Sequence, residues 1–196
     1  MDTHEAPQPP AAGLAAPAAP REQLLEPLTA LDFAMHVSMR YHAKRRAWFD
    51  GLHRAAVVIA ALGSSAAAAA IFGGLTGAAA DLIVIVAVAA ALDFVFAFAD
   101  RGRAADSLYR RCNALAAEIA AAEKVDEDAL RRWEKQRLLI RSDCEERLLV
   151  LHRICFNLEA EARGYAADAL YLVKLWQRLA AHIVSLPPYR PAHLAD

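Results

Sequence analysis

Two adjacent apolar stretches, about residues 55–76 and 82–99, constrain the fold of this chain more than any other feature. The first stretch carries no formal charge, and a helix needs about 20 residues to cross a bilayer. The second stretch, LIVIVAVAAAL followed by FVFAFA, is more hydrophobic still. Between them lies Gly73-Gly74-Leu75-Thr76-Gly77, a cluster that favours a chain reversal. The pattern predicts a transmembrane helical hairpin.

The alternative is a soluble helical bundle that buries both apolar helices on all sides. Hydrophobic residues make up 57% of the sequence, above the roughly 45–50% of an ordinary soluble domain. A domain of 196 residues has too little chain to surround two adjacent helices of this length. We therefore favour the membrane hairpin over the soluble bundle.

Basic residues flank the two stretches, and the turn between them has none. Those before the first stretch are Lys44, Arg45, Arg46 and Arg54, and those after the second are Arg101, Arg103, Arg110 and Arg111. Basic loops stay on the cytoplasmic side, so we predict that both chain ends lie in the cytoplasm and that the turn lies outside. The three cysteines form no CxxC pair, which is typical of free thiols in a reducing compartment.

Small residues in the first stretch offer a thin surface for a second helix. Helix association in lipid depends on such close packing, and the residues that we expect at the contact are Gly63, Ala66 and Ala70. This surface could hold the hairpin together or join copies of the chain. The alternative is that the alanines only fill the helix.

Asp93 is the charged residue inside the second stretch. An ionised Asp at a helix centre costs about 2.5–3.5 kcal/mol on insertion scales, so it needs a partner. A turn near Gly77 would place Asp93 close to Ser64 and Ser65, and Asp100 opposite Arg54 as an interface pair. Asp93 and Asp100 are seven residues apart and share a helical face. This face either lines a polar seam in an oligomer or holds a protonated or locally hydrogen-bonded Asp93.

The chain outside the hairpin divides into four further segments. Residues 1–21 read as a disordered Pro/Ala-rich tail, 22–54 as an amphipathic juxtamembrane helix, 55–100 as the hairpin, 101–186 as a cytoplasmic helical region and 187–196 as a second tail. Apolar residues recur at alternating spacings of three and four, as in coiled coils. The three cytoplasmic stripes are Leu108, Cys112, Leu115, Ile119, Ala122; Cys144, Leu148, Leu151, Cys155, Leu158, Ala162; and Tyr165, Ala169, Leu172, Trp176, Leu179, Ile183. We expect an all-α fold in which long amphipathic helices form a bundle beside the hairpin.

The sequence contains no catalytic, nucleotide-binding or metal-binding motif, so we predict no enzyme and no cofactor. His152 and Cys155 are three apart, but two ligands do not make a zinc site. Cys144 and Cys155 are expected on one core-facing seam as inert thiols. The carboxylates with arginine neighbours are expected on solvated faces: Glu145, Glu146, Glu159 and Glu161. A net charge of −1 argues against a nucleic-acid partner.

Around the start of the first stretch, basic and aromatic residues alternate from Arg40-Tyr41-His42 through Arg45-Arg46-Ala47-Trp48-Phe49-Asp50. Trp48 and Phe49 suit the headgroup level, and Lys44, Arg45 and Arg46 either attract anionic lipid or serve topology alone. The second stretch leaves through Asp93-Phe94-Val95-Phe96 and Asp100 into the basic run that begins with Arg101 and Arg103.

This layout, over about residues 36–180, resembles the SLATT family of small bacterial proteins, in which two transmembrane helices precede a cytoplasmic helical region. The resemblance implies the bacterial inner membrane and an oligomerising effector that forms pores or perturbs the membrane in conflict or antiphage systems. It carries over no catalytic residues, and the trigger would come from a separate sensor protein or from the cytoplasmic helices. The alternative function is a non-catalytic membrane-anchored adaptor that binds a partner through those helices.

Overall fold

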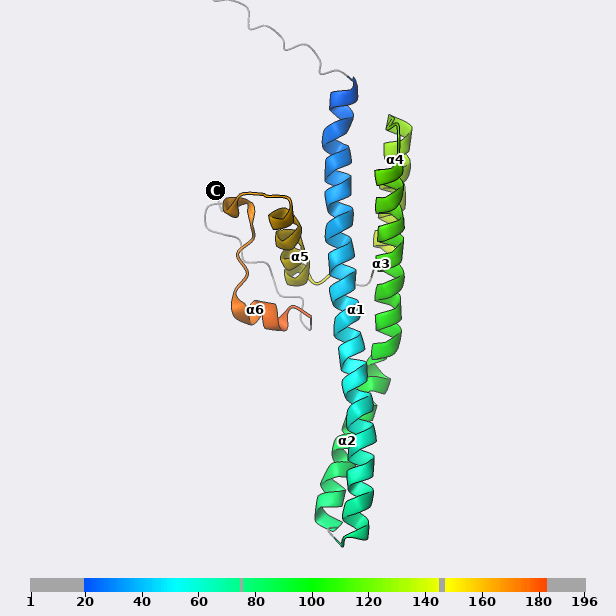
Figure 1. Cartoon of the computed structure of the whole chain (residues 1–196), viewed down its shortest axis with the longest axis vertical. Helices are drawn as coiled ribbons and strands as arrows, with labels where there is room; N and C mark the ends of the chain where they lie inside the picture. The colour runs from blue at the N-terminus through cyan, green and yellow to red at the C-terminus, as the bar shows by residue number, and fades with distance from the viewer. Residues whose placement is uncertain (1–19, 75, 145–146, 183–196) are drawn as a thin grey trace, which may run out of the picture.

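The computed structural model describes residues 20–74, 76–144 and 147–182, and this part of the chain is all-helical (Figure 1). The elements in chain order are α1 (Pro20–Phe72), α2 (Thr76–Phe96), α3 (Phe98–Ala121), α4 (Glu127–Ser142), α5 (Leu149–Ala162), the 3-10 helix η1 (Ala167–Ala169) and α6 (Leu175–Ala180). The all-α prediction is confirmed. The predicted tails lie outside the described residues, apart from Pro20 and Arg21, which begin α1.

Helix α1 is a single helix of 53 residues, about 80 Å long at 1.5 Å per residue (Figure 1). It contains both the predicted juxtamembrane helix and the first apolar stretch, so no structural boundary lies between residues 54 and 55. In the upper part of α1, Leu31 and Met35 are almost fully buried. The apolar lower part is therefore a rigid continuation of a helix that is anchored in the bundle core.

The turn between the two apolar helices comes earlier than predicted. Helix α1 ends at Phe72 instead of residue 76, and α2 begins at Thr76 instead of residue 82. The amides of Gly73 and Gly74 donate to the carbonyls of Ala69 and Ile71, at 2.9 and 3.1 Å. Gly74 has a φ of 76°, the left-handed conformation that closes helix C-termini and that glycine adopts at little cost. Gly74, and not Gly77, thus sets the hairpin register.

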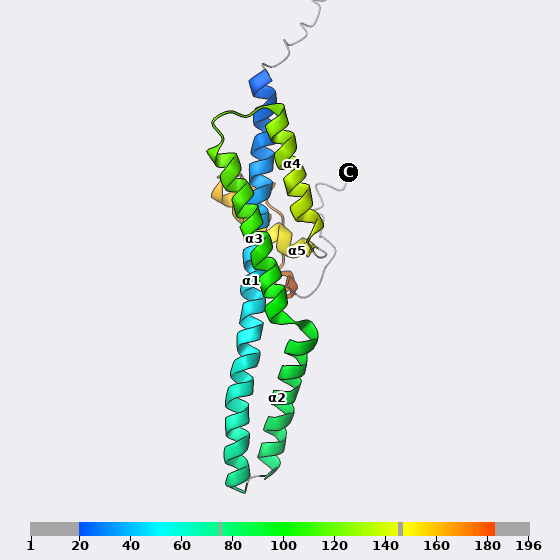
Figure 2. The ribbon, with the colours of Figure 1, turned by 90° about the vertical axis from the view of Figure 1, so that its right-hand side faces the viewer.

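A break at Ala97 separates α2 from α3, where the sequence predicted one uninterrupted helix. Ala97 adopts φ 47° and ψ 50°, a left-handed conformation that is unfavourable for an L-residue with a Cβ. Figure 2 shows the resulting sideways step between α2 and α3. Beyond the step, α3 lies against α1 so closely that a Cβ at Gly102 would be 2.8 Å from Asp50 Oδ1. The break lets α3 make this approach.

Helices α1, α3 and α4 share the larger hydrophobic core. The predicted α3 stripe is confirmed, since Cys112, Leu115 and Ile119 are buried. The full cluster is Leu31, Met35, Cys112, Leu115, Ala116, Ile119, Ala129, Trp133 and Ile140. Asp126 caps α4 by accepting the amide of Ala129 at 2.7 Å. This core holds the upper half of α1.

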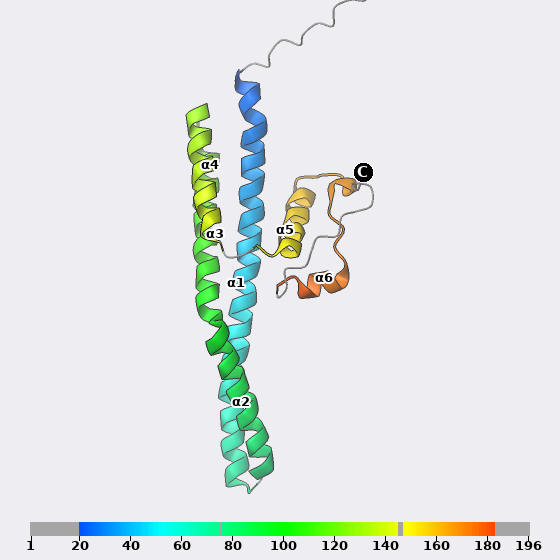
Figure 3. The ribbon, with the colours of Figure 1, turned by 180° about the vertical axis from the view of Figure 1, so that it is seen from behind.

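Helices α5 and α6 lie on the opposite side of α1 from α3 and α4 (Figures 1 and 3). They form a second cluster with α1: Val37, Tyr41, Val150, Leu151, Cys155 and Ala181. The second predicted stripe does not lie on one helix. Its first two members, Cys144 and Leu148, lie between the end of α4 at Ser142 and the start of α5 at Leu149. The chain has to pass α1 between the two clusters, and the Tyr41 hydroxyl accepts the Leu148 amide there at 3.2 Å.

The third predicted helix, residues 165–183, is also wrong. Only η1 and the six-residue α6 are helical among the described residues of that range. Gly164 has a φ of 76° and ends α5. The Asn157 side chain then binds both backbone groups of Tyr171, donating to its carbonyl at 2.7 Å and accepting its amide at 2.9 Å. A side chain that satisfies both backbone groups competes directly with helix formation.

Candidate functional site

The two apolar helices meet along one narrow face of each. The less exposed residues recur at alternating spacings of three and four on both helices. On α1 they are His53, Ala56, Ala60, Gly63, Ala67 and Ala70, and on α2 they are Ala79, Leu82, Val86, Ala89 and Asp93. We call these eleven residues the hairpin seam. Because every α1 residue of the seam except His53 is alanine or glycine, the two backbones approach closely.

Large apolar side chains cover the other faces of both helices. Many of them are at least about half exposed: Val57, Val58, Leu62, Ile71 and Phe72 on α1, and Ile83, Val84, Ile85, Val88, Phe94 and Val95 on α2. By length and composition, α1 and the α2–α3 segment are each long and apolar enough to cross a membrane. Of the most apolar 18 residues in each, 6% and 0% are buried in the fold. Helices in the core of a soluble protein would be mostly buried.

Gly63 occupies the tightest point of the seam. A Cβ at this position would overlap the Cγ2 methyl of Val86. Of the three residues predicted to pack helices, Gly63 and Ala70 lie in the seam, whereas Ala66 is exposed and Ala67 is buried in its place. From Gly63 the less exposed residues follow at spacings of four and then three, whereas the predicted residues follow at spacings of three and then four.

The structure gives Asp93 a different partner from the predicted one. His53 Nδ1 lies 3.2 Å from both carboxylate oxygens of Asp93, at the end of the seam farthest from the turn. Ser64 is exposed, and Ser65 donates to the Ala61 carbonyl of its own helix at 3.0 Å. The predicted grouping of Asp93 with Ser64 and Ser65 is therefore wrong. Moving the turn from Gly77 to Gly74 shifts the position opposite Asp93 by about six residues along α1.

Arg54 and Asp100, the predicted interface pair, are not joined. Asp100 pairs with Arg103 one turn along its own helix, and both side chains are exposed. The link between α1 and α3 is instead Arg46, which donates to Asp106 at 2.6 Å. Asp106 also pairs with Arg110 at 2.8 Å. The Ala97 break accounts for the difference, because the prediction assumed that α2 continues through Asp100 in one register.

The juxtamembrane aromatic residues point to two different surroundings. Phe49 is buried between α1 and α3, with the guanidinium carbon of Arg45 4.5 Å from its ring centre. Trp48 faces the other way and stacks on His182, with ring centres 4.9 Å apart. Lys44 is half-buried on the same turn, and Arg45 donates to the His182 carbonyl at 3.3 Å. Trp48 and Arg45 thus tie the C-terminal end of the described chain to the lower end of the bundle.

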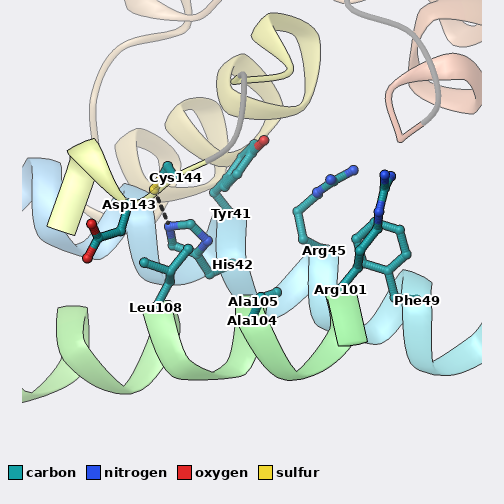
Figure 4. Close-up of a pocket in the computed structure, with 10 residues that line it drawn as sticks. All are labelled: Tyr41, His42, Arg45, Phe49, Arg101, Ala104, Ala105, Leu108, Asp143 and Cys144. Atoms are coloured by element: carbon teal, nitrogen blue, oxygen red, sulfur yellow. Dashed lines mark hydrogen bonds between the residues drawn. The ribbon is translucent and has the colours of Figure 1, made fainter. Parts of the chain in front are cut away.

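A cleft of about 450 Å³, open mouth included, lies between α1, α3 and the end of α4 (Figure 4). Cys144 Sγ and His42 Nε2 are 3.5 Å apart at one end of it, and Arg45 and Arg101 lie at the other end. Burial, then the charges of Arg147 and Arg45, lowers the pKa of His42 to about 4. Burial raises the pKa of the Cys144 thiol.

An imidazole with a pKa of about 4 is a weak base, and a raised thiol pKa disfavours the thiolate, so this environment does not favour an activated nucleophile. Cys144 is half-buried and lies outside α4 and α5, so the prediction that it shares a seam with Cys155 is wrong. Cys155 is fully buried, and burial raises its pKa to about 12. The Cys155 prediction of an inert core thiol fits this environment.

Glu159 is the largest departure from the expected solvated faces. Its side chain is 5% exposed and accepts Arg40 Nε at 2.7 Å and Arg163 Nε at 2.8 Å. Arg163 also donates to Asp32 on α1 at 2.7 Å, which fastens α5 to α1. A signal was present in the sequence, since Glu159 follows Leu151 and Cys155 at steps of four on the apolar face. Glu161 is exposed as predicted, and Glu145 and Glu146 lie outside the described residues.

No cluster of three or more His, Cys, Asp or Glu side chains that could hold a metal ion occurs in residues 20–74, 76–144 and 147–182. His152 instead has Nε2 3.0 Å from Arg147, and burial, then that charge, lowers its pKa to about 4. Comparisons of the chain with family models, with curated proteins and with solved structures found no match.

Proposed function

We propose that α2 and the lower part of α1 span a bilayer as a hairpin, with the helical bundle on one side. The exposed apolar faces on both helices support this proposal most strongly, because such faces are stable in lipid and costly in water. The lengths agree, since residues 55–72 and the 21 residues of α2 extend about 27 and 32 Å, close to the roughly 30 Å of hydrocarbon.

The same proposal places the bundle and both termini in the cytoplasm of a bacterial cell, with the turn outside the inner membrane. The charge pattern supports this orientation. The arginines beyond the hairpin ends are on the bundle side, whereas the turn end has only Asp81 as a charged residue. His53 and Asp93 then lie near the cytoplasmic boundary, where a polar pair is tolerated.

The function that the geometry supports best is a non-catalytic, membrane-anchored scaffold whose bundle binds a partner protein. The observation that supports this function most strongly is that the hairpin seam leaves its one carboxylate paired within the hairpin. Asp93 contacts His53 inside the hairpin, and the rest of the seam consists of apolar residues packed against each other. An arrangement of this kind positions a bundle at the membrane without needing a conducting path.

The second candidate is the oligomerising, membrane-perturbing effector that the resemblance implies. One observation favours it: Ala61, Ser65 and Ala69 repeat every four residues on an exposed face of α1, away from the seam. Small residues at this spacing let helices of separate copies approach closely. Such an oligomer would act on the membrane after a signal from a separate sensor protein.

Purified protein in dye-loaded and ion-loaded liposomes separates the two candidates. The scaffold predicts no leak above empty liposomes and a monomer or small fixed oligomer by cross-linking. The effector predicts a leak that rises steeply with protein density and falls when Ala61, Ser65 and Ala69 are replaced by leucine. An Asp93→Leu variant that keeps a full leak would exclude a conducting role for Asp93, and any wild-type leak would contradict the scaffold.

A further inference from the structure

Helix α6 lies crosswise to the long α1 helix, at the lower edge of the bundle (Figure 1). Its position along α1 is fixed by His182, which stacks on Trp48 and accepts a hydrogen bond from Arg45. Trp48 is about seven residues above the start of the span at residue 55, or about 10 Å at 1.5 Å per residue. If the hairpin spans the bilayer, α6 lies at the headgroup level of the cytoplasmic leaflet.

The segment around α6 exposes large apolar side chains. Leu172, Leu175 and Trp176 are 64%, 74% and 54% exposed, although Gln177 and Ala181 of the same segment are buried. Gln177 turns inward and its Oε1 accepts the Lys174 amide at 3.0 Å. Leu175 and Trp176 therefore lie on faces of α6 that the described chain does not cover. Arg178 is exposed beside them.

We propose that residues 172–178 form a second membrane contact, in which Leu172, Leu175 and Trp176 enter the headgroup region of the cytoplasmic leaflet. Apolar side chains with basic neighbours, on a helix that lies flat at the interface, match the physics of interfacial helices. Trp is one of the two aromatic side chains that are enriched at this depth. The occupant is a lipid surface and not a protein, because α6 shares its level with Trp48 and with the basic flank. This inference rests on the proposed membrane hairpin.

The contact would fix the tilt of the bundle relative to the membrane. A hairpin alone leaves this tilt free, whereas a second contact on the α5–α6 side holds that side of the bundle against the bilayer. In that orientation α3 and α4, on the opposite side of α1, point away from the contact (Figure 3). A partner protein would then meet the same face in every copy.

An environment-sensitive NBD label at three exposed apolar positions tests the contact. The variants are Leu175→Cys for α6, Val88→Cys for the hairpin and Leu138→Cys as the matched control on α4, each in a Cys144→Ala chain whose other thiols are buried. Leu138 and Val88 are 54% and 53% exposed, so all three labels start from comparable surfaces. The chain is reconstituted in vesicles with 30% anionic lipid, and aqueous dithionite is added to reduce accessible labels.

The expected result is that the label at position 175 is reduced several-fold more slowly than the label at 138, and that its emission is blue-shifted. A label at 175 that reacts as fast as the one at 138, while 88 is protected, overturns the α6 contact and leaves the hairpin intact. A reactive label at 88 overturns the hairpin proposal itself. Protection at 175 that grows with the protein-to-lipid ratio overturns the lipid assignment in favour of a second copy.

Discussion

The tightest point of the hairpin seam gives the sharpest mutational test of the fold. A Gly63→Ala substitution adds one methyl group where Val86 Cγ2 already stands, well inside the roughly 3.5–4.0 Å at which carbon atoms pack. Valine has a stiff χ1 in a helix, so it cannot turn the methyl aside freely. Overpacking of this kind costs about 1–3 kcal/mol.

Gly51→Ala is the matched control, because Gly51 lies in the same helix and nothing is within 4 Å of its added Cβ. Both substitutions gain the same helix propensity, about 0.5–1 kcal/mol for glycine to alanine. The difference between the two variants therefore isolates the overlap with Val86. We expect Gly51→Ala to be stabilising, and Gly63→Ala to be less stable than Gly51→Ala by about 1–3 kcal/mol.

The assay is unfolding in mixed detergent and SDS micelles, followed by circular dichroism at 222 nm. A double variant, Gly63→Ala with Val86→Ala, should recover most of the loss, because the second change removes the overlapping methyl. This pair forms a double-mutant cycle with an expected coupling of about 1–2 kcal/mol. Equal stability of Gly63→Ala and Gly51→Ala, or no coupling to Val86, would refute the seam packing.

Three further changes test the rest of the structure. Glu159→Gln removes a buried acceptor of two arginines and should cost about 2–4 kcal/mol in thermal or denaturant unfolding, and a neutral effect would contradict the network. Burial raises the pKa of Glu159, but hydrogen bonds from those arginines outweigh this effect and hold the pKa below its ordinary value of 4.5. The stabilisation by the charged carboxylate should therefore persist above pH 4.5 and be lost as the pH falls below that value. Ala97→Gly removes the Cβ from a left-handed backbone conformation and should raise the free energy of unfolding by about 1 kcal/mol. A loss of stability would contradict the left-handed conformation of residue 97. Burial lowers the pKa values of His42 and His152 from 6.5 to about 4, so both should stay neutral in NMR titrations down to about pH 5. Because the unfolded chain takes up these protons first, the folded state should lose stability as the pH falls from 6.5 towards 4. Titration of either residue near pH 6.5 would show that it is solvated.

Composition and periodicity were enough to predict the helical class, the two apolar helices and the α3 stripe, because these depend on local pattern. The register of the hairpin was not predictable in the same way. The sequence has a glycine at positions 74 and 77, and either could end the first apolar helix. Only the φ of 76° at Gly74 shows which one does so. The partner of Asp93 followed from that choice, so the His53 contact was missed.

Breaks in the helical pattern were the other failure. The predicted apolar stripe includes Cys144 and Leu148 although both lie outside a helix, because α4 and α5 are on opposite sides of α1 (Figure 1). Glu159 was assigned to solvent by its charge, although its phase with Leu151 and Cys155 placed it on the buried face. The first error comes from tertiary packing around α1, which a single helical pattern does not encode, and the second comes from weighing the charge of Glu159 above its helical phase.

The most direct test of the account is labelling of single cysteines with a membrane-impermeant maleimide in spheroplasts. Gly77→Cys reports on the turn and Ser107→Cys on α3, in a chain whose three native cysteines are alanine. A hairpin that spans the inner membrane with its bundle inside predicts rapid labelling at 77 in intact spheroplasts and labelling at 107 only after permeabilisation. Equal labelling at both positions in intact spheroplasts, or recovery of the unlabelled chain in the soluble fraction, would contradict it.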